Sequence, residues 1–269
     1  MGSVLERTKI AKFADEHTRT VQAWLASRAP QGKRLKLSTV DASSTGLQIQ
    51  FLNLALSRPP SPDATEDQIN KNIESVQSFF AGQNVPWYWM LTADSAKIMA
   101  NHLERHGMVY DPPDLPTMVA PLPAPKLDID PAIRVWQANN RNDLIAASKI
   151  RHTAFRFPDG VGTTYFEDMQ ADWLTNNNVH LYLANVEVDT PAAIGALIIG
   201  ANMPGVYVMA TLPEYERKGL GRAILNRILA DAEAMGYSHI VLTASSKGYP
   251  LYQKFGFEHV FDYIFYSNA

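Results

Sequence analysis

The chain has 269 residues, of which 46% are hydrophobic, and its 24 basic and 27 acidic side chains give a net charge of −3. Such a balance offers no general attraction to nucleic acid or to an anionic membrane, so neither is expected as a partner. The sequence contains no cysteine, which excludes disulfides, thiolate metal sites and a cysteine nucleophile.

The beginning of the sequence, MGSVLERTKIAKFADEH, is charged and has no apolar core, so we expect no signal peptide. Gly2 follows the first methionine, but the sixth residue is Glu6 instead of serine or threonine, which argues against myristoylation. No apolar run approaches the ~20 residues that a membrane-spanning helix needs. These features favour a cytoplasmic protein.

Hydrophobic periodicity predicts a mixed series of elements in the first half. In chain order they are a helix at about 4–28, a strand at 47–56, a helix at 65–80, a strand at 87–91, a helix at 94–106 and a strand at 117–122. Prolines crowd the tract from 111 to 131, where they remove backbone donors and prevent a helix. We therefore expect two domains, at 1–125 and 126–269, joined within this tract.

The predicted elements of the second half run in the order β-α-α-β-β-β-α-β-α-β, which indicates an α/β fold with helices on the faces of a mixed sheet. They are a strand at 133–137, a helix at 143–155, a helix with Phe166, Met169 and Trp173 on one side, strands at 179–188, 193–201 and 206–211, a helix from about 219 to Gly236, a strand at 239–243, a short helix at 249–255 and a strand at 259–266. The β-α-β-α-β order of the first half matches the last five of these elements. HLERHGM at 102–108 also aligns with LYQKFGF at 251–257, so we predict an internal repeat.

Residues 215–225 read YERKGLGRAIL and place Gly219 and Gly221 beside basic side chains at the start of an amphipathic helix. The first amides of a helix have no intrahelical acceptor, and the helix dipole makes that end positive. Glycines let an anion approach this backbone, and Arg217, Lys218 and Arg222 add positive charge. A solvated basic turn is the simpler alternative. The position of the motif, between an apolar strand and a regular helix, favours an anion site.

The spacing of these glycines matches neither a P-loop nor a Rossmann fingerprint. The stretch Glu216-Arg217-Lys218-Gly219-Leu220-Gly221 instead resembles motif A of the GNAT superfamily of acyl-CoA-dependent N-acyltransferases, written Q/R-x-x-G-x-G/A. The resemblance implies that backbone amides from Gly219 to Arg222 hold the coenzyme A pyrophosphate. Glu216 stands where the family usually has Gln or Arg, and an acid beside a pyrophosphate could weaken its binding.

The resemblance extends over residues 131–269 in element order. SSKGYPLYQKFGF at 245–257 is similar to the late family motif N-x-x-A-x-x-L-Y-x-x-x-G-F, with Ser245 in place of Asn and Gly248 in place of Ala. It implies a GNAT-like, mostly antiparallel sheet flanked by helices, with a smaller degenerate GNAT-like domain in the first half. In this family the strand before motif A splays from its neighbour. The main chain of Met209, Ala210 and Thr211 is therefore implied to pair with the pantetheine arm of acetyl-CoA.

Acyl transfer needs an acid for the departing thiolate, a donor for the oxyanion and a base for the amine. The resemblance implies that Tyr252 is the general acid, although packing alone could explain a tyrosine there. It implies the backbone N–H of Met209 as the oxyanion donor. The strand before motif A lacks the glutamate that many relatives use. Tyr207 is the titratable side chain of that strand. The base is left open between a water relay and four side chains of the preceding helices and loop: His152, Asp159, Glu167 and Asp168.

The first half has SRPPSPDATEDQINKN at the position of the glycine motif. Prolines there lack N–H donors, and three acids would repel a pyrophosphate. Leu103 aligns with Tyr252. We therefore predict that the first half keeps the scaffold but has neither the coenzyme site nor the acid.

The sequence thus predicts an acetyl-CoA-dependent N-acetyltransferase that acts on a primary amine of a small molecule. Aromatic and acidic residues between 155 and 168 are candidates for the acceptor site, or else form ordinary core with a solvated rim. A non-catalytic acyl-CoA-binding sensor and transfer to a hydroxyl are the alternatives. No metal site is expected, since His102 and His106 have no third ligand in the pattern HLERH. A homodimer is left open.

Overall fold

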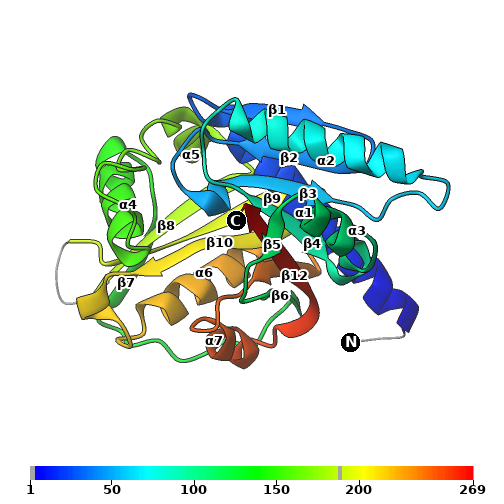
Figure 1. Ribbon diagram of the computed structural model, residues 1–269. Coiled ribbons are helices and arrows are strands. Elements are labelled where there is room, and N and C mark those ends of the chain that lie inside the picture. Colours follow the sequence, from blue (N-terminus) through cyan, green and yellow to red (C-terminus); the bar gives the residue numbers. More distant parts are fainter. Residues whose placement is uncertain (1–3, 187–189, 269) are drawn as a thin grey trace. The chain divides into compact units, whose positions relative to one another are not determined.

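The computed structural model describes residues 4–186 and 190–268 (Figure 1). The chain forms two compact units. The larger unit consists of Met1–His17 and Met118–Val260, and the smaller unit consists of Thr18–Thr117 and Phe261–Ala269. Helix α1 (Val4–Arg28) and strand β12 (Glu258–Asn268) therefore each contribute residues to both units.

The larger unit is built on a sheet with the strand order β6-β11-β10-β9-β8-β7. Neighbouring strands from β7 to β10 are antiparallel, whereas β10 and β11 are parallel. This is the mostly antiparallel mixed sheet that the sequence predicts. The strands are β6 (Leu115–Pro121, in this unit from Met118), β7 (Ile133–Gln137), β8 (Val179–Val186), β9 (Ala193–Gly200), β10 (Met203–Thr211) and β11 (His239–Thr243).

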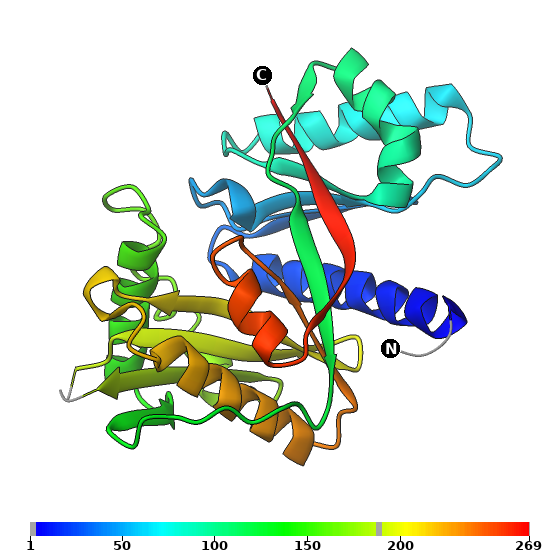
Figure 2. The ribbon, with the colours of Figure 1, turned by 90° about the horizontal axis from the view of Figure 1, so that it is seen from below.

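Helices cover both faces of this sheet (Figures 1 and 2). α6 (Leu220–Ala234) lies across one face in contact with β7 to β10, and α4 (Arg141–Ala154) packs on β9 and β10 from the other. Gly195 lets α6 come close, because a Cβ there would lie 2.6 Å from Cγ2 of Ile224. α5 (Gln170–Thr175) contacts β8, and the short α7 (Tyr249–Lys254) packs in the same core as α6.

The core of the larger unit follows from the sequence of α6. Ile224, Ile228 and Ala232 recur at four-residue steps and are fully buried against the sheet. Fully burying one such side chain contributes roughly 1.5–3 kcal/mol relative to its exposed state. This apolar stripe fixes the direction of α6, and with it the place where the helix begins.

The smaller unit repeats part of this arrangement. Its sheet has the order β1-β2-β3-β4-β12, and β3 and β4 are parallel as β10 and β11 are. α2 (Glu66–Ala81) follows β3 and α3 (Ala93–Arg105) follows β4, as α6 follows β10 and α7 follows β11. The predicted repeat of element order is therefore present. The strands are β1 (Lys33–Lys36), β2 (Val40–Ser44), β3 (Asn53–Ser57), β4 (Tyr88–Thr92) and β5 (Met108–Tyr110), which pairs with β12.

The last strand of the chain belongs to the smaller unit from Phe261 onward. There β12 runs antiparallel to β4, with Tyr263 opposite Thr92 and Tyr266 opposite Trp89. The first helix, in contrast, belongs to the larger unit as far as His17. The compact units are thus composed differently from the contiguous segments 1–125 and 126–269. The assignment of separate roles to those segments stays a prediction.

Several predicted boundaries are wrong. The segment predicted as a strand at 47–56 begins with irregular residues and a 3-10 turn, η1 (Gln50–Leu52), and becomes a strand only at Asn53. The helix expected to carry Phe166 begins only at Gln170, so Phe166 lies in the loop before α5. Val188, the end of the strand predicted at 179–188, lies outside the described residues. None of the described helices is long and apolar enough to cross a membrane.

Candidate functional site

Strand β10 changes its pairing halfway along its length. Its parallel register with β11 is at Gly205 and Val241. Its antiparallel register with β9 shifts between Tyr207 and Ala210, where Val208 has a φ of +53°. A bulge of this kind twists a strand and re-aims its main chain. Met209, Ala210 and Thr211 lie at and after the bulge, on the part of β10 beyond its register with β11.

The glycine motif follows β10 directly. A short 3-10 turn, η2 (Pro213–Tyr215), leads to Glu216, and α6 begins after Gly219. Gly219 has a φ of +91°, a left-handed conformation that favours glycine. No side chain caps the helix at this residue. The first amides of α6, at Leu220, Gly221 and Arg222, therefore lack both intrahelical acceptors and a side-chain cap.

Gly221 plays a different part from Gly219. A Cβ at residue 221 would contact only Cδ2 of Leu251, at 3.9 Å, so the space in front of it is open. Leu251 belongs to α7, which places that helix beside the first turn of α6. The absence of a side chain at Gly221 thus leaves room next to the uncapped amides.

The basic side chains of the motif surround the start of α6. Nη2 of Arg222 lies 3.4 Å from the position that a Cβ on Gly219 would take. Nε of Arg222 is buried, and no described residue accepts a hydrogen bond from it. Nζ of Lys218 lies 4.7 Å from the centre of the Tyr215 ring. A donor without an acceptor beside uncapped helix amides is an arrangement that suits an anion.

Glu216, the residue that departs from the family pattern, is paired. Its carboxylate accepts a hydrogen bond from Nζ of Lys247, which lies in the turn before α7. The ion pair places a positive charge next to this acid. The repulsion that Glu216 would exert on a pyrophosphate is therefore reduced.

Tyr252 lies on α7 with 8% of its surface exposed. Its ring packs edge to face on Phe257, with the ring centres 5.9 Å apart. Burial raises the pKa of Tyr252 to about 12, so its hydroxyl keeps its proton at neutral pH. Tyr252 belongs to the core that also contains Leu220 and packs against Met209. The predicted acid and the predicted coenzyme residues therefore lie in one part of the larger unit.

The corresponding helix of the smaller unit begins differently. Thr65 caps α2, with its hydroxyl accepting from the backbone N–H of Gln68 and the Gln68 side chain accepting in return. Glu66 in the first turn of α2 pairs with Arg105 at 2.6 Å. Leu103, which aligns with Tyr252, is fully buried. The start of α2 is thus occupied by its own side chains, whereas that of α6 is not.

The candidate bases are mostly engaged by neighbouring groups. His152 Nε2 donates to the carbonyl of Pro158 at 3.0 Å, and Asp168 accepts from the Thr164 hydroxyl at 2.9 Å. Glu167 accepts from the hydroxyl of Ser148. Asp159 is exposed in the loop that follows α4. None of them is singled out as a base by its surroundings.

Tyr207 has a partner that the sequence did not indicate. His17, on the part of α1 that belongs to the larger unit, lies with its ring centre 5.7 Å from that of Tyr207. Nδ1 of His17 donates to the carbonyl of Gly200 at 2.9 Å, and its Nε2 is buried without a hydrogen-bond partner among the described residues. Burial lowers the pKa of His17, against the opposing effect of backbone hydrogen bonds. β10 begins 186 residues after His17, at Met203, so no local sequence pattern indicates the contact.

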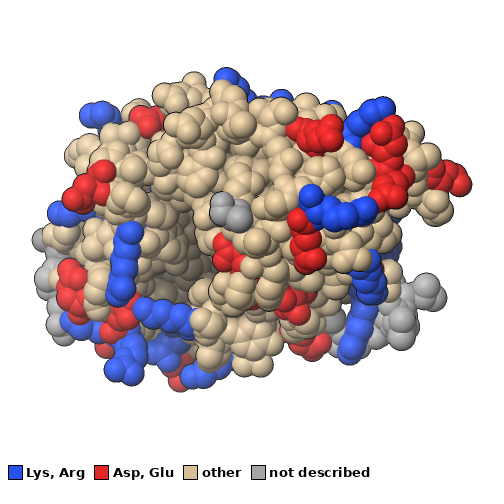
Figure 3. Space-filling view, in the orientation of Figure 1, with Lys and Arg blue, Asp and Glu red and all other residues tan. Residues whose placement is uncertain are grey.

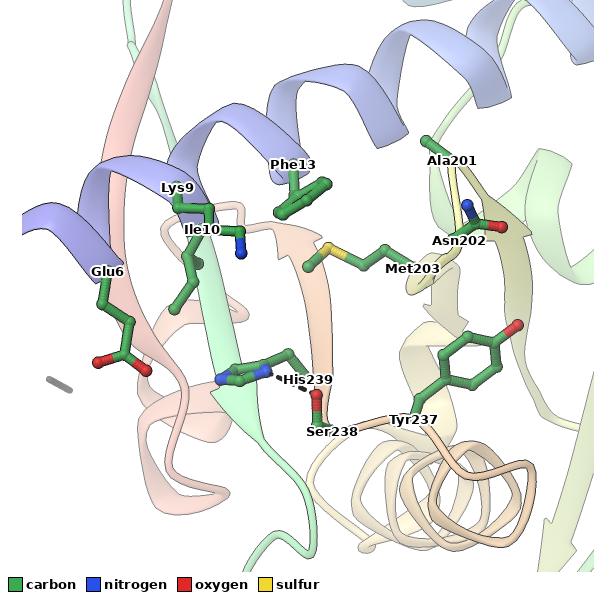
Figure 4. Close-up of a pocket in the computed structure, with 10 residues that line it drawn as sticks. All are labelled: Glu6, Lys9, Ile10, Phe13, Ala201, Asn202, Met203, Tyr237, Ser238 and His239. Atoms are coloured by element: carbon green, nitrogen blue, oxygen red, sulfur yellow. Dashed lines mark hydrogen bonds between the residues drawn. The ribbon is translucent and has the colours of Figure 1, made fainter.

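The surface of the larger unit is hollowed over β8 and β10, beside α4, and Lys and Arg side chains gather where α6 begins (Figure 3). A separate cavity of about 450 Å³ lies where β10 and β11 start, at the strand ends opposite to the glycine motif. Figure 4 shows Glu6, Lys9 and Phe13 of α1 above it, with His239 of β11 facing them. This cavity contains none of the predicted site residues. No group of side chains that could hold a metal ion occurs among the described residues.

Comparisons with known proteins identify a related domain in the larger unit. Residues 177–259 match the family model described as an acetyltransferase (GNAT) domain. No curated protein matches the chain by sequence. This segment contains the bulged strand, the glycine motif and α7, which are the parts that carry the predicted site.

Solved structures share the fold of the whole chain. A GCN5-related N-acetyltransferase from Kribbella flavida superposes with a TM-score of 0.69 at 16% identity, over 94% of this chain and 95% of that one. One from Sphaerobacter thermophilus gives 0.65 at 15% identity, over 85% and 75%. A tandem GNAT protein from the clavulanic acid biosynthesis pathway gives 0.60 at 10% identity, over 94% and 96%. At these identities the likeness shows the fold, including a second GNAT-like half.

Proposed function

Since the chain is a member of the GNAT superfamily, we propose that it is an N-acetyltransferase, which transfers the acetyl group of acetyl-CoA to a primary amine of a small molecule. The observation that carries the proposal is the start of α6. Three features there support it: uncapped amides, open space in front of Gly221, and a buried Arg222 Nε that donates to none of the described residues. Together they suit an anion.

The residues present fit the coenzyme. The amides from Gly219 to Arg222 would hold its pyrophosphate, and Arg217, Lys218 and Arg222 would add positive charge. The main chain of Met209, Ala210 and Thr211 would pair with the pantetheine arm. Acetyl-CoA supplies the activated acetyl group, and every other contribution comes from the chain.

Two groups of the chain would act on the reacting atoms. The N–H of Met209 would donate to the carbonyl oxygen as negative charge develops there. As the C–N bond forms and the C–S bond breaks, the hydroxyl of Tyr252 would give its proton to the sulfur. The amine loses one proton in the same reaction, and this proton restores Tyr252, so charge and protons balance.

Release of free thiol from acetyl-CoA tests the proposal. The protein is incubated with acetyl-CoA and a panel of primary amines, hydroxyl compounds and no acceptor, and acetylated products are identified by mass. We expect thiol release that requires an amine. Binding of acetyl-CoA without release under any condition would make the protein a sensor instead, and release with hydroxyl compounds alone would make it an O-acyltransferase.

A further inference from the structure

Arg151 is a buried cation for which no described residue supplies a counter-charge. It lies on α4, in the larger unit, with 3% of its surface exposed. Its Nη1 is buried, and no described residue accepts a hydrogen bond from it. Burial lowers the pKa of its guanidinium, and the Tyr165 phenol acts to a smaller extent in the other direction. Burying an ion without a partner is costly, so such a group calls for an explanation.

Two aromatic rings hold the guanidinium of Arg151. Its Cζ lies 3.8 Å from the centre of the Tyr165 ring and 4.7 Å from that of Phe157. Both rings come from the loop between α4 and α5. Aromatic faces attract a guanidinium and fix its plane, but they accept no strong hydrogen bonds in place of an anion. The rings therefore orient Arg151 without neutralising it.

Another buried arginine shows how this chain satisfies such a group. Arg19, in the smaller unit, has 4% of its surface exposed. Its Nη1 donates to the carbonyl of Leu56 and its Nη2 to that of Ser57, both at 2.7 Å, and Asp41 lies 4.0 Å away. Arg151 has no equivalent of these carbonyls or of this carboxylate among the described residues.

Two acids of the loop between α4 and α5 are engaged elsewhere. Glu167 accepts from Ser148, whose hydroxyl in turn accepts from the backbone N–H of Phe166 at 3.1 Å. Asp168 accepts from Thr164. The effect that opposes burial at the pKa of Arg151 comes from the Tyr165 phenol and not from either carboxylate. Among the described residues, no carboxylate neutralises Arg151, so a bound molecule that carries an anion would suit this position.

The location of Arg151 indicates which molecule brings that anion. α4 packs on β9 and β10, and β10 carries the residues proposed to hold the thioester. On the basis of the proposed function, we propose that Arg151 binds a carboxylate of the acceptor, so that the substrate is an amine that also carries a carboxylate group. A planar carboxylate matches the fork of a guanidinium held between rings. Phe157 is half-buried and its ring lies over the guanidinium, so it would have to turn aside for the carboxylate to enter. Gly160 and Gly162, both with positive φ, lie in the same loop.

Binding of carboxylates without any amine tests this site apart from catalysis. Acetate, succinate and phenylacetate are each compared with the corresponding neutral amide by calorimetry and by their effect on Tm. We expect at least one carboxylate to bind wild type on the order of 10²-fold more tightly than its amide, because the amide offers no charge to Arg151. The preference should vanish in Arg151→Met and shrink in Arg151→Lys, which keeps the charge but lacks the fork. Phe157→Ala should retain the preference for the carboxylate over its amide, because Arg151 is still present.

Three results of this comparison would overturn the carboxylate site. One is that no carboxylate binds better than its amide, and another is that the preference survives in both Arg151 variants. The third applies if Arg151→Met does not fold: an unchanged preference for the carboxylate in Arg151→Lys would then overturn the site. A gain in Tm for unliganded Arg151→Met would support the site independently, because replacing an unpaired buried charge by an apolar side chain relieves its desolvation cost.

Acetyl transfer to amines with and without a carboxylate is the second test of the site. Glycine is compared with methylamine, β-alanine with ethylamine, and phenylalanine with phenethylamine. We expect kcat/KM to favour the carboxylate member of the accepted pair on the order of 10²-fold in wild type, and this ratio to approach one in Arg151→Met. Acetylation without such a preference would refute the carboxylate site and leave the proposed function intact. Arg151-dependent binding with no acetylation of any amine would refute the function and leave the site.

Discussion

The ring of Tyr252 lies against Gly248, so that a Cβ at residue 248 would be 2.8 Å from Cε2 of Tyr252 and 3.3 Å from its hydroxyl oxygen. The related motif usually has alanine at this position. In this chain the glycine makes room for the ring, and the phenol takes a position that an alanine would not permit.

Gly248→Ala should displace Tyr252. Gly248 has a φ of −81°, so the backbone accepts alanine and the clash falls on the ring alone. We expect kcat to fall about tenfold or more with little change in the Kd of acetyl-CoA, since a positioned acid contributes roughly 10²–10⁴-fold. Gly82→Ala, at φ −67° with its nearest neighbour at 3.4 Å, is the matched control. The double variant Gly248→Ala, Tyr252→Phe should have a kcat no lower than that of Tyr252→Phe alone. If the two losses of kcat were additive, Gly248 would act independently of the Tyr252 hydroxyl.

Tyr252→Phe removes one hydroxyl and keeps the ring. The loss should act on the transition state, so we expect kcat to fall by about 10², the low end of the range for a positioned acid. The effect is limited because a thiol with a pKa near ~8.5 leaves fairly well without help. Steady-state kinetics with a working amine and calorimetry with acetyl-CoA measure the two quantities. Equal kcat values would remove Tyr252 from the mechanism, and a large loss of affinity alone would make it a binding residue.

The ion pair of Glu216 with Lys247 predicts a salt-dependent effect on coenzyme affinity. Lys247→Met leaves the carboxylate unpaired beside the motif, so the Kd of acetyl-CoA should rise about two- to fivefold at low salt. In a Glu216→Gln background, Lys247→Met should leave the Kd of acetyl-CoA unchanged, because residue 216 then carries no negative charge that could repel the pyrophosphate. A loss of affinity in Lys247→Met that persists in the Glu216→Gln background would instead mean that Lys247 contacts the coenzyme.

His17 predicts a pH-dependent stability. Its pKa is lowered in the folded protein, so the unfolded chain takes up a proton first as pH falls below about 6.5. Stability from this residue is therefore present above pH ~6.5 and is lost as pH falls toward the folded pKa, by at most about 1.4 kcal/mol per pH unit. The groups that face the ring are the carbonyl of Gly200, the backbone of Met203 and Tyr207. His17→Asn keeps a donor for the carbonyl of Gly200 and cannot titrate. The unfolding free energy of this variant should therefore depend less steeply on pH between 7 and 5 than that of wild type. The same pH dependence in both proteins would contradict the prediction.

The helices α2, α3 and α6 could be predicted because their periodicity is strong. α6 was expected from its apolar stripe and from the glycines at its start, and β7 and β11 have the predicted bounds. β1 and β2 escaped prediction because KRLK and VDASS carry little apolar alternation. Their pairing with each other and with β3 stabilises them instead.

The assignment of β12 to the smaller unit had no sequence signal. Its alternating pattern predicts a strand, but such a pattern fits any open sheet edge equally well. Arg151 and His17 were missed for a related reason. Each reads as an ordinary helix residue, and its importance follows from distant residues that fold over it: Tyr165 above Arg151, and Tyr207 beside His17.

The central claim is that the start of α6, and not the corresponding start of α2, holds acetyl-CoA. Gly221→Val tests it cleanly, because a Cβ at this position meets no protein atom closer than 3.9 Å and the fold should tolerate it. The added methyl groups would occupy the space in front of the amides and block backbone approach. The measurement is calorimetric titration of acetyl-CoA into wild type and Gly221→Val. The account predicts one site per chain in wild type and strongly weakened binding in the folded variant. Two equivalent sites, or unchanged affinity in Gly221→Val, would contradict it.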